Sequence, residues 1–98
     1  MGGDVSRHYQ PTRQGKVLRK SLCRLKHTVE IGRDLGRQIK AAEQVRIAQL
    51  ALIKAKRDLI AEYPQRDLHG RQLRNLEIEE DRWLSLAVET IINEQMQG

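Results

Sequence analysis

Residues 45–60 read VRIAQLALIKAKRDLI, and this stretch decides the fold class. Its apolar residues recur at steps of three and four, which is the spacing of one face of an α-helix. They are Val45, Ala48, Leu52, Ala55 and Leu59. Further apolar residues make positions 45–53 apolar on most of the circumference. We therefore expect this helix to be buried against more than one neighbour.

The boundaries of this helix follow from the residues around it. No glycine or proline occurs between Arg37 and Glu62, and the residue types in this run have high helix propensity. The run ends at Tyr63 and Pro64, because proline disfavours helical geometry at the residue before it and lacks a backbone donor. The sequence predicts a helix over residues 37–62.

Two more apolar stripes flank this segment. Before it, Leu18, Leu22, Leu25 and Val29 step by four, three and four, which predicts an amphipathic helix over about residues 16–31. Gly32 and Gly36 favour a break or bend there, although Ile31, Leu35 and Ile39 would allow one longer helix. After it, a stripe from Leu73 to Ile91 predicts a helix over about 67–95, with Asp67 as a possible cap.

The N-terminal residues carry little structural signal. Gly2 and Gly3 have low helix propensity, and Pro11 biases Gln10 towards extended backbone. We expect residues 1–15 to form a flexible basic arm and residues 16–98 to form a single helical domain, with the helix entry at Thr12 or nearer Lys16.

These segments predict an all-α fold: a long antiparallel helical hairpin of the second and third helices, preceded by the basic amphipathic helix. Two helices cannot cover one that is apolar on nearly all sides. Either the first helix completes a three-helix bundle, or two chains pair into a homodimeric helical bundle. The absence of Phe, with one Trp and two Tyr, and the wide apolar surface favour the homodimer.

Charge is distributed unevenly along the chain. Residues 1–40 hold ten Lys and Arg against three acids, whereas residues 67–98 hold three against seven, within a net charge of +5. A concentrated positive segment attracts a polyanion, either nucleic acid or an anionic membrane surface.

We expect this positive segment to bind nucleic acid through the phosphate backbone. Cations follow one another at helical spacing, and arginine suits bidentate contact with phosphate. Few Asn or Gln and no aromatic residues accompany them, so recognition should be without sequence specificity and should suit a duplex, possibly RNA. The expected contacts are Lys16, Arg19, Lys20, Arg24, Lys26, Arg33, Arg37 and Lys40. In size and charge alone, the chain resembles small accessory proteins of viruses and phages, such as RNA-silencing suppressors.

Two alternatives remain open at this stage. The first six residues fit the N-myristoylation pattern, with Gly2 as the acceptor, and the basic helix would then supply the second membrane signal. The acidic C-terminal segment around Trp83 could instead dock on a partner protein. Its carboxylates could also neutralise the basic row within the chain, which would weaken the nucleic-acid hypothesis.

An enzyme is not expected, and no cofactor or metal is predicted. His8, His27 and His69 lack metal-ligand spacing. Cys23 is the single cysteine, so no intrachain disulfide can form, which fits a reducing compartment such as the cytoplasm or nucleus. We expect Cys23 to lie beside a helix seam. No apolar run is long enough for a membrane span, and no secretory signal is apparent.

Overall fold

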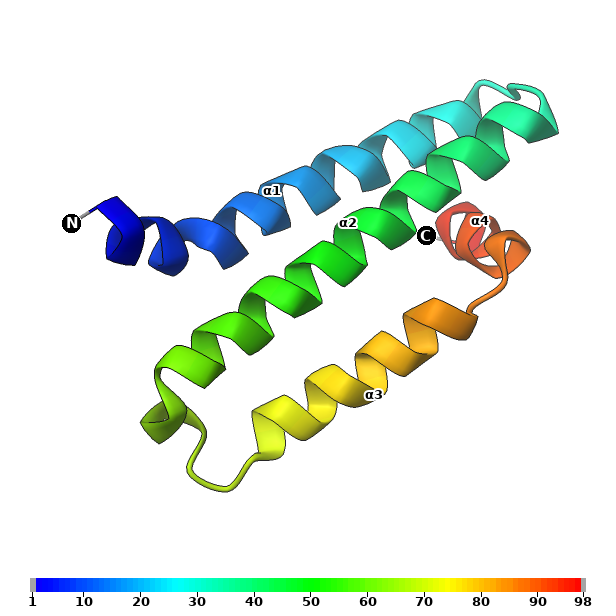
Figure 1. Ribbon diagram of the computed structural model, residues 1–98. Coiled ribbons are helices and arrows are strands. Elements are labelled where there is room, and N and C mark those ends of the chain that lie inside the picture. The colour runs from blue at the N-terminus through cyan, green and yellow to red at the C-terminus, as the bar shows by residue number, and fades with distance from the viewer. Residues whose placement is uncertain (1, 98) are drawn as a thin grey trace.

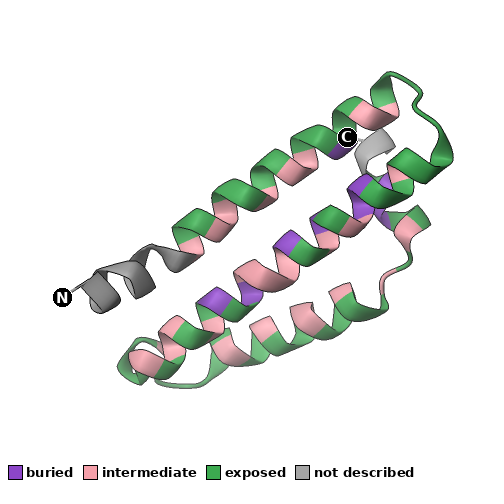
Figure 2. Ribbon diagram, turned by 45° about the horizontal axis from the view of Figure 1, so that its top comes forward, coloured by how far each residue is buried: buried purple, intermediate pink, exposed green. Residues whose placement is uncertain are grey.

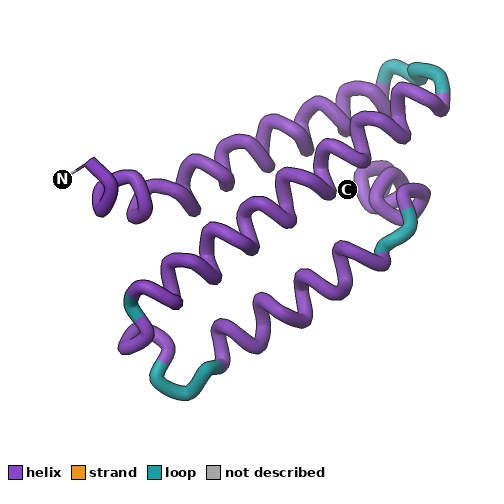
Figure 3. The backbone as a smooth tube through the Cα atoms, in the orientation of Figure 1, coloured by secondary structure: helices purple, strands orange, loops and turns teal. Residues whose placement is uncertain are grey.

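The computed structural model describes the backbone of residues 2–97 and the side chains of residues 11–94. The elements are α1 (Gly2–Glu30), α2 (Leu35–Glu62), the 3₁₀ turn η1 (Pro64–Asp67), α3 (Arg71–Ser85) and α4 (Val88–Gln97). Helices joined by short loops make up all of this described chain, which contains no strand (Figure 3). The predicted all-α class is confirmed.

Helix α2 is the centre of the fold (Figure 1). The helices α1 and α3 lie along opposite sides of α2 and run antiparallel to it, so the three form a layer. Within the described residues the backbones of α1 and α3 do not come close to each other, although Pro11 of α1 and Leu76 of α3 line the same groove. The short α4 crosses one end of this layer and packs against both α1 and α2.

The turn between α1 and α2 is built around Gly32, which has a φ of +68°. Its N–H donates to the carbonyl of Val29 at 3.1 Å, and the N–H of Arg33 donates to the carbonyl of Thr28 at 3.2 Å. This pair of hydrogen bonds is the Schellman motif, which ends a helix and needs a residue that tolerates positive φ. The break favoured at this position by the sequence is confirmed.

Asp34 begins α2 two residues earlier than predicted. Its carboxylate accepts a hydrogen bond from the backbone N–H of Arg37 at 3.4 Å, which satisfies one of the free donors of the first turn. Gly36 therefore lies inside α2 and does not interrupt this helix.

Asp67 provides the cap expected for the next helix, although α3 starts only at Arg71. Its two carboxylate oxygens accept from the N–H groups of Gln72 at 3.0 Å and Leu73 at 2.9 Å. Gly70, with a φ of +66°, turns the chain between the cap and the helix.

The predicted single helix over 67–95 is wrong, because the chain breaks between α3 and α4. Leu86 is extended, with a φ of −69° and a ψ of 129°. The Nη2 of Arg46 on α2 donates to the freed carbonyl of Leu86. The bend lets α4 cross over α1 and α2 and bury Ile91 and Ile92 there, which a straight helix alongside α2 could not do.

The main core lies where α1, α2 and α4 meet (Figure 2). Small Ala41 and Ala42 on α2 let the neighbouring helices approach closely, and larger apolar groups fill the space around them. The buried cluster consists of Leu25, Ala41, Ala42, Val45, Ile91 and Ile92.

The apolar stripes of the sequence predict a core of Val45, Leu52, Leu59, Leu76, Trp83 and Ile91, and only part of it is fully buried. Val45 and Ile91 are buried as expected, whereas Leu52, Leu59, Leu76 and Trp83 are half-buried. The cause is the layer arrangement, since α4 packs on the first half of α2.

The predicted start of the first helix near Lys16 is also wrong. The backbone is helical from Gly2 and continues across Pro11, where the sequence suggested an extended arm. A proline inside a helix lacks the N–H donor and its ring crowds the carbonyl four residues earlier, at a cost of about 3 kcal/mol, and α1 nevertheless continues on both sides of Pro11.

Candidate nucleic-acid interface

Six cations occupy the outer side of α1, and we call them the basic ridge. All six side chains are exposed, and no acidic residue occurs between positions 12 and 29. The ridge consists of Arg13, Lys16, Arg19, Lys20, Arg24 and Lys26.

The ridge faces outward because the opposite side of α1 is committed to the core. Leu25 is fully buried, and Leu18, Leu22 and Val29 pack against the buried cluster. At 100° per residue, the six cations fall within an arc of about 160° on the other side of the helix. Figure 2 shows exposed residues along this outer side.

The dimensions of the ridge match a short stretch of duplex. Arg13 and Lys26 are thirteen positions apart, which is about 20 Å along a helix. A nucleic-acid strand advances by roughly 3.4 Å per phosphate, so the ridge spans about six base pairs. Arg13, Lys16 and Lys20 also border a shallow depression of about 370 Å³, together with Thr12 and Val17.

Within residues 11–94, whose side chains the structure describes, the ridge is not paired with carboxylates. Among the described residues, none of its six cations forms an ion pair. Glu80 instead pairs with Arg57 at 3.0 Å, and Glu94 pairs with Arg82 at 3.4 Å. The acids of α3 lie on the far side of α2, and α4 packs on the apolar side of α1, so neither helix forms an ion pair with the ridge within the described residues.

Five of the eight predicted contact residues lie on the ridge, and three do not. Arg33 is in the turn after α1, while Arg37 and Lys40 are on the first turns of α2. All three are exposed, but the Nε of Arg37 pairs with Asp34 at 3.4 Å. These residues therefore extend the positive surface around the turn.

Sequence reasoning missed Arg13, because residues 1–15 were assigned to an arm. Arg13 precedes Lys16 and Lys20 by three and seven positions, and this helical spacing was the signal that could have identified it. Gly2, the alternative acylation site, lies outside the residues whose side chains the structure describes.

Cys23 lies on the outer face of α1 and is exposed, so the expected place beside a helix seam is wrong. His27 and His69 are exposed as well, and His8 lies outside the described side chains. No group of three or more His, Cys, Asp and Glu in the described residues could hold a metal ion. Across the same residues, no helix combines the length and apolar character that a membrane span requires.

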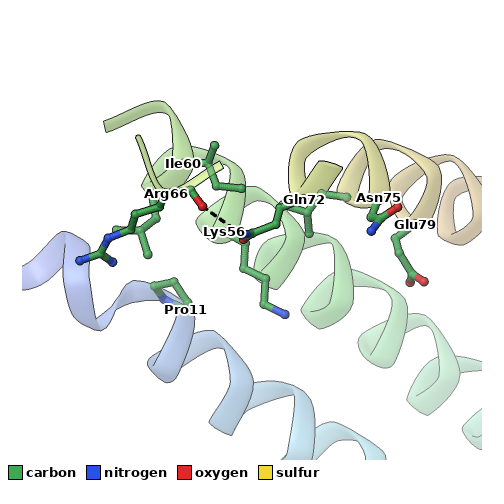
Figure 4. A pocket seen from close by; sticks show the side chains of 9 residues that line it. Pro11, Lys56, Ile60, Arg66, Gln72, Asn75 and Glu79 are labelled. Atoms are coloured by element: carbon green, nitrogen blue, oxygen red, sulfur yellow. Dashed lines mark hydrogen bonds between the residues drawn. The ribbon is translucent and has the colours of Figure 1, made fainter. Parts of the chain in front are cut away.

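A separate groove of about 500 Å³ opens over the second half of α2 (Figure 4). Leu59, Ile60 and Leu76 supply apolar lining, and the rim carries charges of both signs from Lys56, Arg66 and Glu79. The Nε2 of Gln72 donates to the carbonyl of Arg66 at 3.1 Å across one end. The mixed rim gives no concentrated charge for a polyanion, so the basic ridge is the better candidate site.

Comparisons of the chain with protein families, with curated proteins and with solved structures give no match.

Proposed function

We propose that this protein binds duplex nucleic acid through the phosphate backbone, without sequence specificity, and that the basic ridge of α1 makes the contact. The observation that carries the proposal is the ridge itself: six exposed cations on one helix face, with no ion pair among the described residues. Neutralising phosphates with such side chains releases counterions, which supplies most of the affinity in non-specific binding.

The side chains on the ridge favour a duplex over a single strand. Binding of single strands commonly uses aromatic side chains on which bases stack. Positions 12–29 hold no Phe, Tyr or Trp. Asn and Gln are the side chains that read adenine in the major groove, and Gln14, the only such amide in this stretch, is half-buried. Contact with regularly spaced phosphates is what the ridge can provide.

The packing of α1 favours nucleic acid over a membrane surface. A helix that lies in a membrane interface inserts its apolar face between the lipids. The apolar face of α1 is already packed against α2 and α4 through residues such as Leu22 and Leu25. Among residues 11–30 of α1, Val17 is the one large apolar residue that is exposed, at 44%. Membrane anchoring through Gly2 would need the acyl chain to provide the apolar contact.

The proposal is tested by changing two cations of the ridge and two elsewhere. Lys20→Ala with Arg24→Ala removes two ridge charges, and Arg71→Ala with Arg74→Ala removes two exposed charges from α3. If each ridge cation neutralises one phosphate, the ridge variant should reduce the slope of log K against log salt by about 1.8. Its affinity at 0.1 M salt should fall by roughly 60-fold, while the α3 variant should bind nearly as wild type.

The assay is a titration with duplex RNA, duplex DNA and single strands at two or more salt concentrations. Equal weakening by both variants would show that net charge, not the ridge, determines binding. Wild-type protein that binds no duplex at 50 mM salt would refute the proposal. Flotation with anionic vesicles, with and without N-terminal acylation, would reveal the membrane alternative.

Cys23 offers an independent readout, because it is the single cysteine and is exposed on the outer face of α1. A bound duplex should cover it and slow its reaction with a maleimide reagent. The double variant at Lys20 and Arg24 should lose this protection at the same duplex concentration. An unchanged reaction rate at saturating duplex would place the contact elsewhere.

A further inference from the structure

The link between α3 and α4 consists of Leu86 and Ala87, and neither residue breaks a helix (Figure 3). Leucine and alanine are among the best helix formers. No glycine or proline occurs anywhere in residues 71–97. The local sequence therefore allows one continuous helix through the link, and contacts from outside the link hold the break.

Two side chains bind carbonyls that the break leaves without a helical donor. The Nη2 of Arg46 on α2 donates to the carbonyl of Leu86, and the hydroxyl of Ser85 donates to the carbonyl of Arg82 at 3.3 Å. In a continuous helix, these two carbonyls would instead accept from the backbone N–H groups of Thr90 and Leu86. The same carbonyls can thus be satisfied in two ways.

The contact made by Arg46 is incomplete. Its Nε is buried and has no hydrogen-bond partner among the described residues, and none of the ion pairs in the described part of the chain includes this guanidinium. A buried donor without a partner costs free energy. The broken arrangement therefore contains a cost that release of Arg46 to solvent would remove.

A continuous helix would fit beside α2. The φ of Leu86, −69°, is already close to the helical value, so rotation about ψ from 129° to about −42° converts this residue to helix. The ion pair between Arg57 and Glu80 at 3.0 Å fixes the register of α3 against α2. In that register, position 97 of a continuous helix lies opposite about position 40, which is still within α2 (Leu35–Glu62).

The docked position of α4 depends mainly on two side chains. Ile91 and Ile92 are buried, at 1% and 5% exposure, on a surface of α1 and α2 that we call the α4 seat. Beyond these apolar contacts, Arg82 of α3 pairs with Glu94 of α4 at 3.4 Å, and both side chains are exposed, so this pair contributes little. The α4 seat consists of Leu25, Ala41, Ala42 and Val45.

We propose that α4 is a hinged flap, which leaves the α4 seat and joins α3 as one continuous helix over residues 71–97, with Leu86 as the hinge. Opening exposes the apolar seat, and closing covers it. Such exchange takes microseconds to milliseconds, and the minor conformation of a protein is commonly populated at about 0.1–10%. This inference does not depend on nucleic-acid binding, because the basic ridge lies on the side of α1 away from the seat.

The test is carbon-13 relaxation dispersion on the full chain without nucleic acid, because the chemical shift of each Cα reports whether that residue is helical. The wild-type protein should show a minor state in which Leu86 and Ala87 have helical shifts. Arg46→Met removes the donor to Leu86 but keeps an apolar stem, and it should raise the minor population by about tenfold or more. Arg74→Met makes the same change at an exposed site on α3, and this control should leave the population unchanged.

Ala87→Pro should lock the flap closed. Leu86 is already extended, as the residue before a proline prefers to be, and no described hydrogen bond is donated by the N–H of Ala87. We therefore expect this variant to fold as the wild type does. Proline inside the continuous helix should lower the open population by roughly 100-fold, so the exchange should disappear.

Three results would overturn the proposal. The first is the absence of a minor state in both the wild type and Arg46→Met. The second is a minor state with random-coil shifts over residues 88–97, which would mean that α4 unfolds and does not join α3. The third is exchange that persists in Ala87→Pro. Circular dichroism confirms that each variant is folded.

Discussion

Ile91→Ala should destabilise the fold strongly, because Ile91 is the large α4 side chain most completely buried in the core, at 1% exposure. The substitution removes three carbons, and burial contributes about 0.8 kcal/mol for each methylene. The lost transfer energy is therefore about 2.4 kcal/mol, and the remaining cavity adds to it. We expect a decrease of about 3–4 kcal/mol in the free energy of unfolding.

Ile78→Ala on α3 is the matched control, since Ile78 is 60% exposed. Only about two fifths of its surface is buried, so the same three carbons contribute about 1 kcal/mol. Alanine returns about 0.4 kcal/mol through its higher helix propensity. The expected loss is about 0.6 kcal/mol, several times smaller than at Ile91.

Urea denaturation followed by circular dichroism measures both variants. For a chain of this length, a loss of 3 kcal/mol also corresponds to a decrease in Tm of roughly 12–24 °C. Equal losses at the two sites, or a loss below about 1 kcal/mol at Ile91, would refute the reasoning that α4 docks on α1 and α2 as the structure has it.

Three further substitutions test the local geometry. Gly15→Ala should raise the free energy of unfolding by about 0.5–1 kcal/mol, because Gly15 is inside α1 and an added Cβ meets no atom within 4 Å; a loss measured by thermal denaturation would contradict this. Gly32→Ala should lower it by about 1–2 kcal/mol, because the φ of +68° is strained for alanine, and urea denaturation that showed no loss would argue against the positive φ. Asp67→Ala should lower the free energy of unfolding by about 1–2 kcal/mol. It should also speed amide exchange at Gln72 and Leu73, because the Asp67 carboxylate accepts hydrogen bonds from their N–H groups, and unchanged exchange would exclude the cap.

The strongest local signals in the sequence predicted the fold elements best. The prediction of α2 was accurate at both ends. The uninterrupted run of helix-forming residues placed its start within two residues, and the stop at Tyr63 and Pro64 placed its end at the observed Glu62. Gly32 marked the end of α1, since a left-handed position at a helix end is a local requirement that one residue can satisfy.

The features that depend on tertiary contacts were not predictable in the same way. Nothing in the residues Leu86 and Ala87 breaks a helix, and the break exists because Arg46 binds the freed carbonyl while Ile91 reaches the core. Likewise, Leu52 and Leu59 are half-buried because of where α4 crosses, which periodicity cannot indicate. Periodicity identifies the face that is apolar, but not how many helices will cover it.

The sequence predicted that exposed cations would form the candidate site, and it predicted part of the set of residues. The outward position of Lys20 and Arg24 follows from amphipathic spacing within one helix. The pairing of Arg37 with Asp34 depends on the geometry of the turn, and Arg13 was missed because Gly15 favoured a helix start nearer Lys16.

The separation of α1 from α3 has a consequence for the rate of association. Between residues 11 and 30, α1 carries six cations and one acid, whereas α3 carries three cations and four acids. The molecule therefore has an electric dipole across its width, and the field of a polyanion exerts a torque on it before any contact is made. Approach with α1 in front raises the fraction of productive encounters. This orientation acts over the Debye length, which shortens from about 30 Å at 0.01 M salt to about 8 Å at 0.15 M.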